Sequence, residues 1–158
     1  MKFPWSLGIT AALVFAADRI SKVLMFEILS QHSSIWVIPP FFNFSLVLNR
    51  GTAFGLFQNS IPILIVVSLL VLAGIGYFYM QEKKPTLLFH LSLGFLLGGA
   101  LGNLFDRIFL GYVIDFINFT FWPTFNLADV SIDVGIVGLV LYYYVFNKKA
   151  VKKNLKKG

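Results

Sequence analysis

Cysteine is absent from the 158 residues of this chain, and histidine occurs only at His32 and His90. Without cysteine, disulfide bonds, thiolate metal sites and cysteine nucleophiles are excluded. The two histidines do not have the spacing of a helical zinc site, so neither a metal nor an organic cofactor is expected. Charged residues are also scarce, at 13% of the chain against about 25% in an average soluble domain. Any chemistry must therefore depend on a small set of polar side chains.

Apolar residues, in contrast, are abundant, at 58% of the chain, with a mean hydropathy of +0.80. A helix needs about 20 apolar residues to cross a bilayer. The sequence predicts an all-α membrane protein of one domain, residues 1–158, with four transmembrane helices and a small extracytoplasmic β-sheet or cradle with its loop. The predicted spans are about 5–28, 61–80, 86–105 and 130–146.

The positive charges indicate how the chain is oriented in the membrane. Lys2, Lys83, Lys84 and the lysines of a basic tail, residues 147–158, all fall on one side of the predicted spans, whereas the opposite loops hold only Arg50 and Arg107. Cytoplasmic loops carry the excess of Lys and Arg, so both termini are predicted to be cytoplasmic. The tail follows an apolar helix directly, which favours contact with anionic membrane lipids. No nucleic-acid partner is expected, because no folded basic domain accompanies the tail.

Two further patterns concern local structure. Residues 42–49 alternate, with Phe42, Phe44, Leu46 and Leu48 on one side, which predicts a strand with one apolar face. This strand could cradle an extended peptide, or it could only anchor its loop at the membrane surface. In the third span Gly94, Gly98 and Gly102 recur every four residues, as in a helix face that packs closely against a neighbour.

Two acids stand out, because each lies at the edge of an apolar segment. Asp115 follows Gly111–Ile114, and Asp129 comes just before the last long apolar run. An acid at the centre of a bilayer costs roughly 2.5–3.5 kcal/mol on insertion scales, so such residues are candidates for function. Two carboxyls that meet can share one proton and activate water. Asp129 could alternatively cap the helix that follows it, whereas Asp115 has no obvious capping role.

Other polar residues collect on the same predicted external side. Asp18 and Lys22 are four residues apart in the order that favours a helical ion pair, which could be structural or functional. Asp106 could form an ion pair with its neighbour Arg107, and Asp133 lies one helical turn after Asp129 as a supporting polar group. A non-catalytic scaffold or a small four-span proton- or cation-coupled transporter are alternatives, but a transporter predicts acids near the midplane.

Five short motifs follow one another in order along almost the whole chain. Each is weak alone, and together they are specific. They are D-x-x-S-K (Asp18 to Lys22), N-x-G-x-A-F-G (Asn49 to Gly55), G-N-x-x-D-R (Gly102 to Arg107), V-x-D-F (Val113 to Phe116) and F-N-x-A-D (Phe125 to Asp129).

This ordered set resembles lipoprotein signal peptidase, the type II signal peptidase of bacteria, a family of membrane aspartic proteases. The resemblance implies an enzyme of the bacterial cytoplasmic membrane, with its active site near the extracytoplasmic face. It removes the signal peptide from diacylglyceryl-modified prolipoproteins, just before the lipidated cysteine, and a monomer is expected. Departures from the family pattern are Thr52, in place of alanine, Arg19, in place of glutamine, and a short segment between the two acids.

The resemblance also implies roles for individual residues. The catalytic pair would be Asp115 and Asp129, with Asp106 as the alternative member of the pair. The supporting residues would be Asp18, Lys22 and Asp106. The residues that line the pocket for substrate would be Asn49, Gly51, Asn103, Arg107 and Asn126.

Overall fold

The computed structural model describes residues 5–51 and 60–155, with side chains described as far as residue 145. It contains four helices and one small sheet in the order helix, two strands, two helices, strand, helix. The helices are α1 (Trp5–Ser30), α2 (Ile61–Gln81), α3 (Leu87–Phe109) and α4 (Leu127–Leu155), and the strands are β1 (Ile35–Ile38), β2 (Phe42–Asn49) and β3 (Val113–Phe119).

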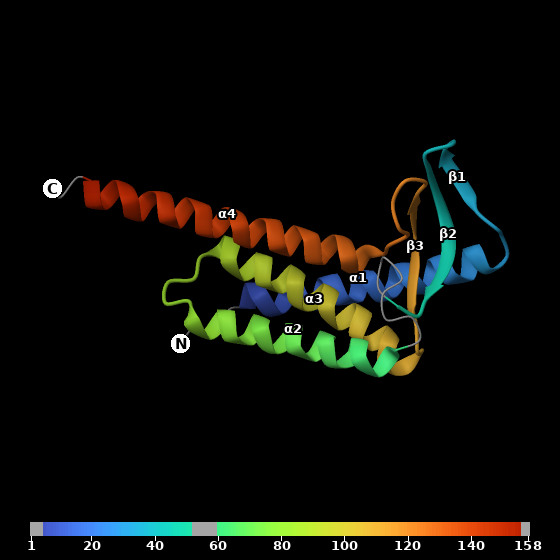
Figure 1. The fold of residues 1–158 in the computed structure, drawn as a ribbon, viewed down its shortest axis with the longest axis horizontal. Coiled ribbons are helices and arrows are strands. Elements are labelled where there is room, and N and C mark those ends of the chain that lie inside the picture. Colours follow the sequence, from blue (N-terminus) through green and yellow to red (C-terminus); the bar gives the residue numbers. More distant parts are fainter. Residues whose placement is uncertain (1–4, 52–59, 156–158) are drawn as a thin grey trace.

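The helices form an elongated bundle, and the sheet lies at one end of it (Figure 1). The start of α1 and the end of α4 both lie toward the opposite end of the bundle. Three segments have the length and hydropathy of a membrane span. The predicted helical protein with a small sheet is confirmed. These segments are Ile61–Gln81, Leu87–Phe109 and Leu127–Val145, with mean hydropathies of 2.5, 1.6 and 1.5.

Helix boundaries differ from the predicted spans at the end near the sheet. Helix α3 continues to Phe109 because the polar residue Asp106, which hydropathy places in a loop, is fully buried and paired with Lys22. Helix α4 begins at Leu127, before the apolar run, because Asn126 and Asp129 bond to each other's backbone N–H and cap its first turn. Polar residues that hydropathy assigns to loops thus belong to helices.

Helix α3 packs against all three other helices, and its glycine stripe faces α1. A Cβ atom built on Gly94 would lie 2.7 Å from Thr10 Cβ, and one on Gly98 would lie 2.7 Å from Ala11 O. One built on Gly102 would meet the carboxylate of Asp18. The predicted close packing is confirmed, and it brings the polar end of α3 against that of α1.

We expect Gly98→Ala to destabilise the bundle by about 1–3 kcal/mol, the usual cost of forcing a methyl group into a packed contact. The added methyl group would meet the α1 backbone at 2.7 Å. Gly76→Ala is the matched control, because a Cβ there has nothing within 4 Å. Thermal unfolding in detergent measures the difference, and equal melting temperatures for the two variants would contradict close α1–α3 packing.

The sheet is antiparallel in the order β1-β2-β3, so β2 is central. The strand predicted over 42–49 is confirmed. A register shift between Phe44 and Val47 interrupts the alternation. Leu48 is consequently 45% exposed, contrary to the prediction of one continuous apolar face, and the most buried side chain of β2 is Asn43.

Apolar contacts hold the sheet on the end of α1. Leu29 of α1 packs with Ile114 and Phe116 of β3, all three of them buried. On its other edge, β3 receives the segment before α4, since the Phe116 and Ile117 N–H groups both donate to the Phe125 carbonyl. Strand β3 is thereby fixed between α1, β2 and the start of α4, which determines where Asp115 lies.

Candidate active site

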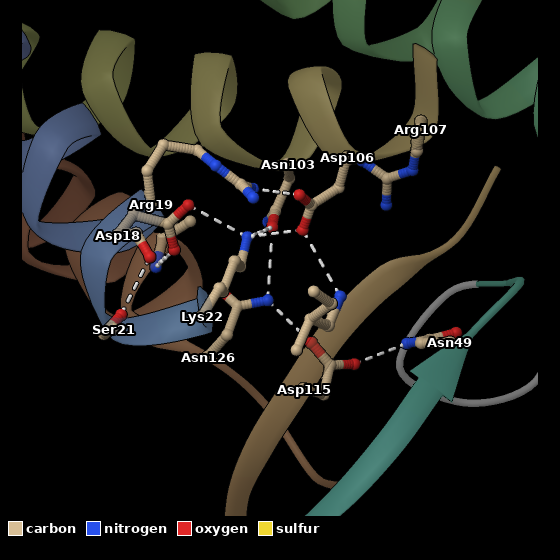
Figure 2. Close-up of polar contacts among 12 residues, drawn as sticks. Asp18, Arg19, Ser21, Lys22, Asn49, Asn103, Asp106, Arg107, Asp115 and Asn126 are labelled. Carbon is tan, nitrogen blue, oxygen red and sulfur yellow. Dashed lines mark hydrogen bonds and ion pairs between the residues drawn. The ribbon is translucent and has the colours of Figure 1, made fainter. Parts of the chain in front are cut away.

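Asp115 lies on β3 and is 2% exposed. Its two carboxyl oxygens each accept a hydrogen bond from a side-chain amide: Asn126 Nδ2 lies 2.6 Å from Oδ1, and Asn49 Nδ2 lies 2.8 Å from Oδ2 (Figure 2). Burial raises the pKa of Asp115 to about 7, and the nearby charge of Asp129 raises it further against the lowering effect of the amide donors. A carboxyl that titrates near neutral pH is suited to proton transfer.

Asp129 lies in the first turn of α4 and takes part in the helix cap. Its Oδ2 accepts from the Asn126 backbone N–H at 3.1 Å, while Asn126 Oδ1 accepts from the Asp129 N–H at 3.2 Å. Its second oxygen accepts from Asn103 Nδ2 at 2.8 Å. The capping role that the sequence left open is therefore confirmed, and it leaves Asp129 at the wall of a cavity.

Asn126 connects the two acids. It is fully buried, and its side-chain amide donates to Asp115 Oδ1 and, at 3.1 Å, to Asn103 Oδ1, while its backbone holds Asp129. Asp115 and Asp129 line the same cavity of about 270 Å³. The remaining lining residues are Asn49, Gly51, Asn103, Arg107, Val113, Trp122, Pro123, Thr124, Phe125 and Asp133.

Lys22 determines how the amide of Asn103 is oriented. Its ammonium group can only donate, and it lies 3.0 Å from Asn103 Oδ1, so the amide nitrogen of Asn103 must point toward Asp129. Lys22 is fully buried and also pairs with Asp18 and Asp106, each at 2.9 Å. This confirms the Asp18–Lys22 ion pair, and it shows that the lysine orients a residue of the cavity.

The two other buried acids on this side, Asp18 and Asp106, have structural partners (Figure 2). Asp18 accepts from the Ala128 N–H at 3.0 Å and so ties the start of α4 to α1. Asp106 accepts from the Ile114 N–H at 3.3 Å, next to Asp115. The Asp106–Arg107 ion pair is not among the salt bridges of the described residues, since Asp106 pairs with Lys22 and Arg19 instead. Asp106 is also absent from the cavity lining that the structure describes.

Gly51 and Arg107 lie at the cavity as well. The Gly51 N–H donates to Asn49 Oδ1 at 2.9 Å, which leaves the Asn49 amide nitrogen for Asp115. Arg107 donates to Ser68 Oγ at 3.4 Å, and its buried Nε has no hydrogen-bond partner among the described residues. This N–H is thus a buried donor on a residue that lines the cavity. The motif residues 52–55 lie outside the described residues.

Sequence reasoning missed two features of the site. Arg19 bonds to Asp106 across 87 positions of sequence, and its guanidinium lies 4.7 Å from the ring centre of Phe105. No local pattern could have indicated so distant a partner. The other feature is the cavity wall formed by Trp122, Pro123 and Thr124, which precede the motif around Asp129. No three metal-ligating side chains converge anywhere in the part of the chain that the structure describes.

The fold and the site together define a class of protein: a helical membrane protein with three aspartates, Asp115, Asp129 and Asp133, around one small cavity at the end of the bundle that carries the sheet. Comparison with known proteins makes the class specific. Residues 10–146 match the family model described as signal peptidase (SPase) II. The chain belongs to the signal peptidase II family.

Individual relatives agree with the family match. The chain is 42% identical over 148 residues to the lipoprotein signal peptidase of Desulfitobacterium hafniense, covering 93% of this chain and 97% of that one. It is 38% identical over 152 residues to that of Pelotomaculum thermopropionicum, covering 95% and 99%. A solved structure of a bacterial membrane enzyme has a TM-score of 0.83 at 26% identity, covering 93% of this chain and 92% of its own.

Proposed function

We propose that this chain removes the signal peptide from diacylglyceryl-modified prolipoproteins as a membrane aspartic endopeptidase, cleaving just before the lipidated cysteine. Membership of the signal peptidase II family supports the peptidase activity and the prolipoprotein substrate. The comparisons give the transporter alternative no support. The observation that carries the aspartic mechanism is the pair of carboxyls, Asp115 and Asp129, held in one cavity by the amide of Asn126.

In the proposed mechanism one carboxyl is protonated while the other is the base. Asp115, with a pKa raised to about 7, is the group that retains a proton below neutral pH. Asp129 then takes a proton from a water molecule in the cavity, and that water attacks the scissile carbonyl. Asp115 donates its proton to the carbonyl oxygen and stabilises the charge that develops there. Asp129 then passes the proton it took from water to the nitrogen of the scissile bond, the C–N bond breaks, and Asp115 takes back a proton as the new carboxyl group forms. The two carboxyls titrate as a coupled pair, since each senses the charge of the other.

The amides position these acids and the substrate. Asn49, Asn103 and Asn126 each donate to a carboxyl oxygen, so neither acid can rotate freely. Arg107 and Gly51 line the cavity in which a peptide would lie. Such fixed donors contribute to catalysis because they need no reorganisation during the reaction.

We further propose that α1 is the fourth membrane span, in a single domain of residues 1–158. Its charged residues Asp18 and Lys22 are fully buried in the bundle, whereas Leu13 and Ile20 of the same helix are at least 60% exposed. This distribution is that of a helix with its polar face inside the protein and its apolar face in lipid. The excess of lysines at the end opposite the sheet supports cytoplasmic termini and an extracytoplasmic site in the bacterial inner membrane. We expect the enzyme to act as a monomer among membrane lipids.

The test is cleavage by the purified protein in detergent or lipid. A diacylglyceryl-modified precursor and the same precursor without the lipid are incubated in parallel, and the shortened product is detected by mass spectrometry. We expect product from the modified precursor alone. Absence of product from both, or equal cleavage of both, would contradict the proposed function.

A further inference from the structure

A second hollow lies along α4, directly beside the catalytic cavity. It has a volume of about 550 Å³ and is lined by residues that recur at helical spacing, so it runs down one face of the helix. Phe125 and Asp133 line both this groove and the catalytic cavity, so the two are continuous. The residues of this groove, called the α4 groove below, are Phe125, Val130, Asp133, Val134, Val137, Gly138 and Leu141.

The lining of the α4 groove is apolar apart from Asp133, which lies toward the end of α4 nearest the sheet. Val134 and Val137 are 46% and 57% exposed, so their side chains are available to an apolar partner. Asp133 is exposed and has neither a hydrogen bond nor a salt bridge within the described part of the chain. Acids in membrane helices are rare and usually have a polar partner. The Asp133 carboxyl is therefore expected to bind a polar group of a ligand at the mouth of the groove.

The substrate has two apolar parts, its acyl chains and its signal helix. The length of the groove shows which of them fits. From Asp133, at its mouth, to Leu141 the helix rises about 12 Å, at 1.5 Å per residue. One leaflet of the hydrocarbon core is about 15 Å thick, and the whole core is about 30 Å. The groove therefore has the length of an acyl chain in one leaflet, whereas the signal helix of the substrate must cross both leaflets.

The position of the groove fits the same part of the substrate. Asp133 lies one helical turn, about 6 Å along the axis, below Asp129. This is the reach of one or two residues of an extended peptide. The lipid-modified residue contributes the nitrogen of the scissile bond, so its own N–H lies at the catalytic pair. The next backbone N–H along the peptide is a donor within reach of the Asp133 carboxylate, which would place Asp133 beside the lipid-modified residue. An acyl chain attached to that residue would then enter the groove below.

From this juxtaposition we infer that the α4 groove is the binding subsite for an acyl chain of the substrate's lipid-modified residue, with Asp133 at its mouth. The inference rests on the proposed function and adds where the lipid is recognised. The enzyme then distinguishes substrates by the length of their acyl chains, through contacts with α4.

The test compares two tryptophan variants of α4. Val137→Trp fills the middle of the groove, whereas Val140→Trp, at a position that is 62% exposed and outside the groove, adds the same bulk elsewhere on α4. Each is assayed with precursors whose acyl chains either reach Val137 or are too short to reach it. Each methylene excluded from an apolar site weakens binding by about fourfold. We expect Val137→Trp to raise KM for the long-chain precursor by about tenfold or more, and to leave the short-chain precursor unchanged.

The controls separate this inference from the proposed function. Val140→Trp is expected to match the unmodified enzyme with both precursors, and thermal unfolding checks that both variants fold. If the unmodified enzyme cleaves both precursors but Val137→Trp is indistinguishable from it, the subsite is wrong and the function stands. An equal effect on both chain lengths, or an equal effect of Val140→Trp, would mean that the groove holds an ordinary membrane lipid or a second copy of the chain. If the unmodified enzyme cleaves neither precursor, the proposed function itself fails.

Discussion

Asp115→Asn and Asp129→Asn should each lower kcat/KM for the lipid-modified precursor by about 10³-fold or more. General acid–base catalysis by a positioned side chain contributes about 10²–10⁴-fold, and each substitution removes one of the two groups that move protons. Asparagine has the shape of aspartic acid, but its amide nitrogen replaces one of two oxygens that accept from N–H donors, so each variant loses one hydrogen bond at a cost of about 1–3 kcal/mol. The fold is expected to persist at that cost.

Cleavage is measured with equal amounts of correctly inserted protein, judged by size-exclusion chromatography and thermal unfolding. Glu27→Gln is the matched control, since Glu27 is an exposed acid of α1 outside the hydrogen-bond network of the site. It should cleave at the unmodified rate. Near-normal turnover in either Asp115→Asn or Asp129→Asn would remove that residue from the catalytic pair.

Lys22→Met should be the most destabilising single change, at about 3–5 kcal/mol. Removing one partner of a buried ion pair leaves an uncompensated charge, and that range is its usual cost. Lys22 is fully buried and pairs at 2.9 Å with both Asp18 and Asp106, so methionine would leave two buried acids with Arg19 as the remaining cation. The loss should also release the Asn103 amide, whose oxygen now accepts from Lys22.

Thermal unfolding in detergent tests this prediction, with Glu27→Gln as the control on the same helix. Adding Asp18→Asn to Lys22→Met should recover part of the lost stability, because it removes one of the unpaired carboxylates. A melting temperature for Lys22→Met equal to that of the unmodified protein would show that the buried network does not hold α1 against α3 and α4.

The sequence was sufficient to locate the helices and most of the polar residues that line the cavity. Hydropathy located the apolar segments, the spacing of Gly94, Gly98 and Gly102 predicted a packing face, and the motifs identified Asp115 and Asp129. These features are local, or are periodic along one element. The boundaries were less accurate, because burial against other elements allows α3 and α4 to include polar residues that hydropathy excludes.

The hydrogen bonds that organise the site could not be predicted, because they join distant parts of the chain. Lys22 and Asn103 are 81 positions apart, and Asp18 and Ala128 are 110 apart. Strand β3, Val113–Phe119, was also not predicted. Its first residues are buried on both faces, so it lacks the alternation of apolar and polar residues that indicates a strand. The register shift in β2 had no signal in the apolar pattern.

Titration of the aspartate carboxyls by carbon-13 NMR tests the central claim, that Asp115 and Asp129 act as one pair. Asp115 is expected to titrate near pH 7, because burial raises its pKa to about 7 from the ordinary value of 3.8. Because the charge of Asp129 raises the pKa of Asp115, Asp129→Asn should lower it. If the pKa of Asp115 is the same with and without the Asp129 carboxyl, the two groups do not sense each other and the proposed mechanism is wrong.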